Sequence, residues 1–420
     1  MLGGSIAGLL AAQALAHRGD EVIVIERDRL PVGPESRPGV PQAAHVHGLV
    51  SRGQQEIERL LPGFAAELVQ AGAPVVDFAA DVAICNPFGW SVRFPSRLKA
   101  YGASRSLLES LIRRRVLAHP SVELRSQQFA EGLTGVAGLV TGVRVRGTGG
   151  ARLSPIMADL VIDATGRGSR AGHWLRELGY PALPEVVIDI QLGYASRCMR
   201  IPAGHRADWQ ACYIQPGAPH RPRGAMLMPI EDDRWLVTLI GIGADRPSRR
   251  KNDFLAFARS LASPIVADAI ANATPTSPVY LSRSTSSRRR YIEHATAQPA
   301  NFVLVGDAVC CFNPIYAQGM STAAAAATLL GEYRETYSSR RDFAACFHRG
   351  LAKVNNWAWL LATTSDLKWP GARGPRPTSL QRSVDRYTDL VLSSATRDHK
   401  TQQALLDVLH LLRSPTSLMA

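Results

Sequence analysis

The sequence predicts an α/β protein with three parts: a domain built on a parallel sheet, a second domain built on a β-sheet, and a group of C-terminal helices. The parallel sheet is indicated by the start of the chain, which reads as a glycine turn, a helix, a β-branched strand and an acid. The second sheet is indicated by apolar runs at 186–201, 224–231 and 234–243. Residues 331–420 carry apolar residues at helical spacing. A chain of 420 residues is too long for one simple core, which agrees with this division.

The first segment, LGGSIAGLLAAQALAHRGDEVIVIERD, combines the elements of a nucleotide-binding βαβ unit. Ile6 to His17 is rich in Ala and Leu, which favours a helix, and Gly19 with Asp20 ends it. Glu21 to Ile25 is a β-branched run typical of a parallel strand, and Glu26 follows at its carboxyl end. An acid about 20 residues after a glycine turn accepts hydrogen bonds from ribose hydroxyls.

The glycine turn itself predicts a bound dinucleotide. Gly3 allows the tight turn, and Gly8 allows the helix to pack closely on the strand. Ser5 stands where the fingerprint usually has its middle glycine, and it keeps a backbone N–H and a small side chain. The helix N-terminus would receive the pyrophosphate through its free N–H groups. Only Met1 and Leu2 precede Gly3, so either the strand before the turn is cut short or the true start of the protein lies upstream of Met1.

The segment after Glu26 contains no second βαβ unit. It is long, irregular and rich in Pro and Gly, and segments of this kind are usually functional or disordered. Arg37, Gln42, His45 and His47 offer polar groups suited to lining a cofactor cleft. The His-x-His pair lacks a further ligand nearby, so we predict no metal site.

Three later segments agree with a flavin site. The helix of 104–116 begins with Arg105, which could donate two hydrogen bonds to a pyrophosphate. Residues 122–158 alternate like a β-meander, with turns expected at Gly132, Gly135, Gly138 and Gly142. A strand then ends at Asp163, and Gly166 allows close approach of the backbone; these markers stand in the segment MADLVIDATGRGSR.

A fourth segment is FVLVGDAVCCFNPIYAQGM, which places Asp307 at the end of a buried strand after Gly306. A carboxylate there could bind a ribityl or ribose hydroxyl. Pro314, Gly319 and Met320 then open a helix that runs from Ser321 to Leu330. The N–H groups of that helix would stabilise negative charge on the pyrimidine edge of a reduced flavin.

These motifs, in this order and spacing, resemble the FAD-dependent aromatic-hydroxylase and squalene-epoxidase superfamily. Three stretches are most similar to the flavin epoxidases of ionophore polyether biosynthesis, of the lasalocid and monensin type: RPGVPQAAHVHGL, DLVIDATGRGSR and GDAVCCFNPIYAQGMS. The resemblance implies a Rossmann-like FAD-binding domain of the glutathione-reductase type with its β-meander, a substrate-binding sheet and C-terminal helices. It implies an FAD-binding domain at 1–76, 102–175 and 298–330, a substrate domain at 77–101 and 176–297, and a helical region at 331–420.

The resemblance also assigns roles to residues of this chain. Gly3, Ser5 and Gly8 would hold the FAD pyrophosphate with Arg105, Glu26 the adenosine ribose, and Asp307 the ribityl chain. Gly319 and Met320 would lie against the isoalloxazine ring, and Arg37 and His45 would border the flavin. The motif around Asp163 reads Asp-Ala-Thr-Gly where the superfamily usually has Asp-Gly, so direct nicotinamide binding is not expected to be efficient. The full set of expected cofactor-binding residues is Gly3, Gly4, Ser5, Ile6, Ala7, Gly8, Glu26, Arg27, Arg37, His45, Arg105, Asp163, Gly166, Gly306, Asp307, Pro314, Gly319 and Met320.

The implied reaction is oxygen transfer from a C4a-hydroperoxyflavin to an apolar substrate, most simply the epoxidation of an alkene in a polyketide-type natural product of antibiotic biosynthesis. The partners would be that substrate, O₂, and either NADPH or a separate flavin reductase. No catalytic acid–base pair is expected on the protein, because the flavin supplies the chemistry. Two alternatives stay open: a reductase or dehydrogenase of an isoprenoid-like substrate, and a flavoprotein cyclase without redox chemistry.

Composition excludes several other classes. The net charge of +13 comes mainly from scattered arginines without a nucleic-acid motif, so no nucleic-acid partner is predicted. No apolar run is long enough to cross a bilayer. Six scattered cysteines without zinc-ligand spacing predict reduced thiols in a cytoplasmic protein. The pair Trp357 and Trp359 lacks the residues that complete the tryptophan motif of flavin halogenases, which argues against that activity.

Overall fold

A parallel layer forms the centre of the first half of the molecule. The structure is a computed structural model, and it describes residues 1–419 except 137, 148, 152–154, 284 and 338–341. Strand β1 (Val22–Glu26) pairs with β6 (Val122–Ser126), and β10 (Val161–Asp163) pairs with β19 (Phe302–Leu304); both pairs are parallel. Leu2 makes parallel bridges to Ile25 and Asp163 and so joins the two pairs. Met1 also pairs with this layer, since its N-terminus donates to the Ile23 carbonyl and its own carbonyl accepts from the Ile25 amide.

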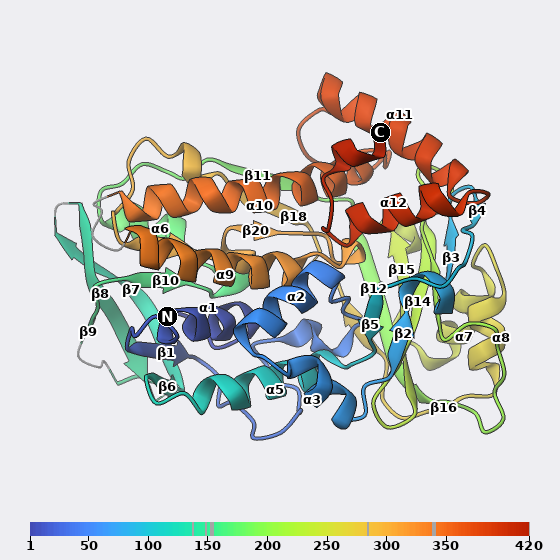
Figure 1. Ribbon diagram of the computed structural model, residues 1–420, viewed down its shortest axis with the longest axis horizontal. Helices are drawn as coiled ribbons and strands as arrows, with labels where there is room; N and C mark the ends of the chain where they lie inside the picture. Colours follow the sequence, from blue (N-terminus) through green and yellow to red (C-terminus); the bar gives the residue numbers. More distant parts are fainter. Residues whose placement is uncertain (137, 148, 152–154, 284, 338–341, 420) are drawn as a thin grey trace.

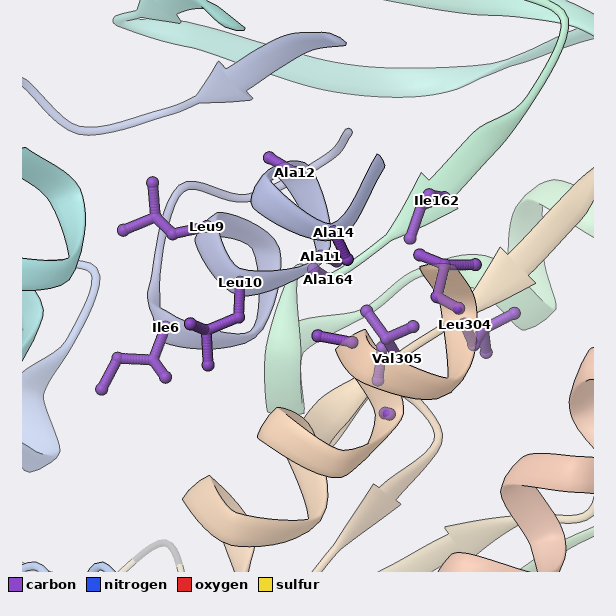
Figure 2. Packing of buried hydrophobic residues seen from close by; sticks show 14 of the residues in the cluster. Ile6, Leu9, Leu10, Ala11, Ala12, Ala14, Ile162, Ala164, Leu304 and Val305 are labelled. Carbon is purple, nitrogen blue, oxygen red and sulfur yellow. The ribbon is translucent and has the colours of Figure 1, made fainter. Parts of the chain in front are cut away.

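Helix α1 (Ile6–Ala16) packs on this layer with almost all of its residues buried. A helix that is apolar all round is a core helix, which explains why its sequence shows no polar face. In Figure 2, Ala11 and Ala14 lie on the side of α1 toward Ile162 of β10 and Leu304 of β19, and all four belong to one buried cluster. Helices α9 (Gly319–Tyr337) and α10 (Phe343–Asp366) run side by side above α1 in Figure 1.

The predicted β-meander is present, but most of its glycines do not mark turns. Strands β7 (Gln128–Val136), β8 (Leu139–Gly147) and β9 (Ile156–Met157) are antiparallel, and residues 137, 148 and 152–154 lie outside the described part of the meander. Gly138 alone stands at a turn, with φ of +80°. Gly132, Gly135 and Gly142 lie inside strands where a side chain would strike neighbouring atoms. Close strand packing therefore explains those three glycines.

The second half of the molecule contains an eight-stranded sheet (Figure 1). Its order is β16 (Thr274–Pro275), β12 (Leu192–Arg200), β15 (Arg234–Ile242), β14 (Arg223–Ile230), β13 (Ala211–Ile214), β3 (Val82–Asn86) and β4 (Gly89–Trp90), with β17 (Tyr280–Ser282) also on β12. The runs predicted at 224–231 and 234–243 are β14 and β15. The prediction of a single strand at 186–201 is wrong, because the extended conformation is interrupted at Gln191, whose φ is +54°. Its first part, β11 (Glu185–Ile188), joins β18 (Ser287–Arg290) and β20 (Cys310–Cys311) in a separate sheet.

The eight-stranded sheet has two different faces. One face packs against α7 (Lys251–Arg259) and α8 (Ile265–Ala271) through a buried apolar cluster that includes Val237, Leu239 and Trp235. The opposite face carries Tyr194 and Ile240, which stand directly across from each other in register. This second face is turned toward the parallel-layer half of the molecule, because Ser196 and Thr238 on it contact the long loop after β1.

Two C-terminal helices cover the outer part of the sheet. Helix α11 (Ser379–Ser394) begins with a capping box at Thr378 and Gln381, and α12 (His399–Leu409) follows it. In Figure 1 both lie above the right half of the molecule, and Leu406 packs with Val82 and Ile84 of β3. The remaining elements are α2 (Ser51–Leu60), α3 (Phe64–Gln70), β2 (Val75–Asp77), α4 (Phe78–Asp81), β5 (Lys99–Tyr101), α5 (Arg105–Leu117) and α6 (Ala171–Glu177), with short 3-10 turns at 41–44, 166–168, 243–245, 292–294, 306–308, 314–316 and 415–419.

We expect Gly8→Ala to destabilise the protein by about 3 kcal/mol, because overpacking a full core is costly. A Cβ atom at residue 8 would overlap the carbonyl oxygen of Gly3, and the backbone cannot yield there without opening the turn. The control is Gly172→Ala in α6, where an added Cβ meets nothing within 4 Å. Urea unfolding of both variants measures the difference. Equal unfolding free energies for the two would contradict the close packing of α1 on its turn.

Candidate functional site

The glycine turn leads directly into the N-terminus of helix α1. Gly3 has φ of +98°, and a Cβ atom there would lie 2.6 Å from the Ala164 carbonyl oxygen. Ser5 is the N-cap of α1, but its side chain does not cap the helix, and the first turn contains no acid. The helix dipole therefore places positive partial charge at the turn, which favours a negatively charged group there.

The acid at the end of β1 closes over this turn. The amide N–H of Gly4 donates to Oε2 of Glu26 at 2.7 Å, and the amide of Asp28 donates to Oε1 at 2.9 Å. Arg37 approaches Oε1 of Glu26 at 3.3 Å and donates to Asp28 at 2.8 Å. The side chain of Glu26 is almost fully buried. Glu26 therefore contacts the glycine turn directly, while its expected role toward the adenosine ribose stays a prediction.

A buried carboxylate that the sequence interpretation missed links this turn to α5. Glu109 accepts a hydrogen bond from the Ser5 hydroxyl, one from Arg105 and one from Arg37, each at 2.8 Å. Arg105 also donates to the Ser5 hydroxyl at 2.8 Å. Burial raises the pKa of Glu109, but the charges of Arg105 and Arg37 more than offset this, and the net pKa lies below its usual range. The one local signal was its position four residues after Arg105, on the same face of the helix.

The segment around Asp307 lies on the other side of α1. Gly306 has φ of +58°, and a Cβ atom there would come 2.8 Å from the Ala7 side chain. Two further glycines lie close to the Asp307 side chain. A Cβ atom added to Gly319, at the start of α9, would lie 3.7 Å from Asp307 Oδ1, and one added to Gly166 would lie 4.0 Å from Asp307 Cβ. Desolvation raises the pKa of Asp307, while the cations of Arg167 and Arg105 oppose the shift. The carboxylate stays half-buried, so it can meet a ligand.

The long loop after β1 joins these places to the sheet. His45 Nδ1 lies 2.7 Å from the Ser196 hydroxyl, and the amide of Val46 donates to Thr238 at 3.0 Å. Gly48 lies against Ala317, just before α9. Burial lowers the pKa of His45 to about 4, so its imidazole is neutral at neutral pH. The loop therefore borders the region between the glycine turn, α9 and the sheet.

Three of the expected residues lie apart from these contacts. Arg27 is largely exposed and reaches only Asp28 and the Gly39 carbonyl. Asp163 is fully buried and accepts hydrogen bonds from Thr165 and Ser169, so it holds its own turn. Pro314 is exposed on the 314–316 turn. The roles of these residues toward a cofactor stay predictions, as do those of the other members of the set.

The face of the eight-stranded sheet that is turned toward this region is apolar and incompletely covered. Tyr213 and Met226 stand opposite each other in the middle of the sheet, yet both are only half-buried. The Tyr213 hydroxyl donates to the Ile315 carbonyl at 3.5 Å, so the turn before α9 faces this part of the sheet. Tyr194 and Met228 share this face. Trp235 does not, because it belongs to the cluster under α7 and α8.

A second buried carboxylate, Asp366 at the end of α10, holds the turn before α9. It accepts hydrogen bonds from Tyr316 at 2.7 Å, from Ser287 at 3.0 Å and from Asn313 at 3.1 Å. Burial raises its pKa to about 6, although these three donors act in the opposite direction. These contacts could not be predicted from the sequence, because the three hydrogen-bond donors lie between 50 and 79 positions from Asp366.

The comparisons with known proteins decide the family. Residues 1–333 match the model of the FAD binding domain family. The chain belongs to this family. FAD is thus its cofactor, and the family places it among the FAD-dependent monooxygenases. The match covers most of the chain, including all the segments around the glycine turn, Arg105 and Asp307.

Individual relatives are similar over long stretches. The chain is 32% identical to Protein Rv3254 of Mycobacterium tuberculosis, over 99% of this chain and 90% of the relative. It is 24% identical to kynurenine 3-monooxygenase of Salinispora arenicola, over 83% of this chain and 74% of that enzyme.

Solved structures share the fold of this flavoprotein. The flavin-dependent brominase Bmp2 superimposes with a TM-score of 0.71 at 16% identity, over 97% of this chain and 92% of the brominase. The p-nitrophenol 4-monooxygenase PnpA of Pseudomonas putida gives 0.66 at 16% identity, over 99% and 97% of the two chains. PqsL of Pseudomonas aeruginosa gives 0.62 at 18% identity, over 87% and 96%. At these identities the likeness concerns the fold alone, and the closer resemblance to polyether epoxidases stays a prediction.

The described residues fit FAD. The uncapped N-terminus of α1 and the guanidinium of Arg105 suit a pyrophosphate, and the half-buried Asp307 suits a polyol. Gly3, Gly166 and Gly306 have φ of +98°, +75° and +58°, a backbone conformation that glycine adopts without strain. Across the described ranges, no group of three or more His, Cys, Asp and Glu side chains is placed to hold a metal ion. Nor is any described helix long and apolar enough to cross a membrane.

We expect the raised pKa of Asp366 to make stability depend on pH. Between the ordinary Asp value of 3.8 and about 6, the folded state holds this proton more tightly than the unfolded state. The free energy of unfolding should therefore fall through this group as the pH rises toward 6, by about 3 kcal/mol, and stay level above it. Asp366→Asn removes this titration, so the difference in unfolding free energy between the natural protein and the variant should shrink across that range. A difference in unfolding free energy between the two proteins that stays constant with pH would contradict the raised pKa of Asp366.

Proposed function

We propose that this flavoprotein transfers one oxygen atom from O₂ to an apolar small molecule, and that the preferred reaction is epoxidation of an alkene of a polyketide-type natural product. The observation that carries the proposal is the half-open apolar face of the sheet, with Tyr213 and Met226, turned toward the Ile315 turn that precedes α9. A substrate bound there would lie between the sheet and the flavin.

The charge state of this face supports an apolar, uncharged substrate. Burial raises the pKa of Tyr194, Tyr213 and Tyr316, so these phenols stay protonated at neutral pH. His45 is neutral as well. An alkene needs no charged partner to bind, whereas a carboxylate substrate would need a cation on this face.

The chain's own residues would bind, orient and shield the reactants. Ser5, Arg105 and the first amides of α1 would hold the pyrophosphate, Glu26 the adenosine ribose, and Asp307 the ribityl hydroxyls. Bound FAD supplies the activation of O₂. The apolar sheet and the 313–316 turn would orient the alkene and keep water away from the reacting atoms. One oxygen atom enters the product; the other leaves as water, with two electrons and one proton delivered as hydride from NADPH, directly or through a separate flavin reductase, and a second proton from solvent.

Labelled dioxygen tests the proposal. The FAD-loaded protein is supplied with NADPH, a flavin reductase and a panel of polyene esters, polyprenyl alcohols and phenols, under ¹⁸O₂. We expect a product heavier by one labelled oxygen atom, formed from an alkene more readily than from a phenol. A product that gains two hydrogen atoms instead would favour the reductase alternative. Rearranged product of unchanged mass, without O₂ consumption, would favour the cyclase alternative.

A further inference from the structure

The segment between α10 and α11 crosses the substrate-facing side of the sheet. We call residues 367–374 the strap. Its Arg373 exchanges two backbone hydrogen bonds with Asp189, both at 2.8 Å. The strap ends at Gly374, where an added Cβ would lie 3.0 Å from the Ile188 side chain. The strap is thus fixed on the stretch that links β11 to β12.

Trp369 is the large side chain that the strap places against the sheet. It packs in one buried cluster with Tyr194 of β12 and with Ile240 and Ile242 of β15. Its exposed fraction is 8%. Tyr213 and Ile315, the half-buried pair that joins the sheet to the turn before α9, pack against the same cluster.

The strap is held at its N-terminal end as well. Asp366 ties it to the 313–316 turn through Tyr316 and Asn313. Lys368 Nζ forms ion pairs with Asp385 at 2.7 Å and with Asp389 at 2.8 Å, which anchor α11 beside it. Trp369 therefore has a fixed position relative to both the sheet and the turn, unlike a side chain on a free surface loop.

We propose that Trp369 is a specificity-determining residue, which closes the distal end of the substrate site and limits the length of the apolar chain that fits. The proposal rests on the proposed function, since it takes the sheet face near Tyr213 and Ile315 as the substrate surface. The C-terminal strap then sets substrate size, while the FAD-binding family segments hold the cofactor. An indole at this position offers a rigid apolar wall, and its removal would leave space for several methylene groups.

The test uses the FAD-loaded protein and a series of 4-alkylphenols from 4-methylphenol to 4-heptylphenol. Binding is followed by the change of the flavin absorbance band, which needs no turnover. Trp369→Ala should tighten binding of 4-heptylphenol about tenfold relative to 4-methylphenol, because more of the chain is buried. Ala372→Leu, which adds bulk beside the same cluster, should weaken 4-heptylphenol binding and leave 4-methylphenol nearly unchanged.

The matched control is Trp357→Ala, which removes the same side chain from a site on α10 that is 40% exposed. Its selectivity across the series should equal that of the natural protein. Trp369→Phe provides a milder variant if the alanine variant folds poorly, and it should shift selectivity in the same direction.

The outcomes separate this inference from the function on which it rests. If phenols perturb the flavin equally in all variants, or if Trp369→Ala lowers only the melting temperature, Trp369 is a core residue and the proposal fails. If no phenol perturbs the flavin in any variant while FAD stays bound, the proposal for Trp369 fails, and the proposed function fails with it only if the alkenes also give no labelled product. Protein that binds no FAD would instead overturn the assignment of the cofactor site.

Discussion

The buried carboxylate of Glu109 is the contact on which the cofactor region depends. It receives hydrogen bonds from the glycine turn through Ser5, from α5 through Arg105 and from the long loop through Arg37. Removing one partner of such a buried charged group typically costs about 3–5 kcal/mol, because the remaining charges lose their compensation. The three segments are therefore held together before any ligand arrives, with the guanidinium of Arg105 beside the helix N-terminus that favours an anion.

The parts of the site that lie close together in the sequence could be predicted from it. The turn at Gly3, the core helix with its packing at Gly8, and Asp307 at a strand end all follow from short patterns whose physical demands are local. The conformational requirement of a positive φ at Gly3, for example, can be stated without knowing the rest of the chain.

Contacts between distant segments could not be predicted in this way. Glu109 and Asp366 each collect partners from 50 or more positions away, and a single acid on a helix is more often a surface residue. The interruption of the strand at Gln191 was not predicted, because the run 186–201 is apolar on both sides of that residue. That β11 and β12 join different sheets depends on which strands are available as partners. The glycines of the meander were misread for a similar reason, since crowding by Arg144 or by β9 is invisible in the sequence.

The same long-range contacts shape the substrate side. The neutral phenols, the neutral His45 and the strap come from the sheet, the 313–316 turn, the long loop and the C-terminal region. His45 contacts Ser196 of the sheet, the Tyr213 hydroxyl donates to the Ile315 carbonyl, and Tyr316 donates to Asp366 just before the strap. The cofactor region thus lies within residues 1–333, which match the FAD binding domain family, while the proposed substrate face also includes the strap, which lies beyond that match. This division explains why the cofactor follows from the family, whereas the substrate has to be inferred from contacts.

A crystal structure of the protein with FAD bound would test the central claim most directly. The account predicts one FAD for each chain, with its pyrophosphate between Ser5 and Arg105, its adenosine ribose at Glu26 and its ribityl chain at Asp307. An FAD bound elsewhere, or a pyrophosphate that contacts neither the N-terminus of α1 nor Arg105, would contradict it.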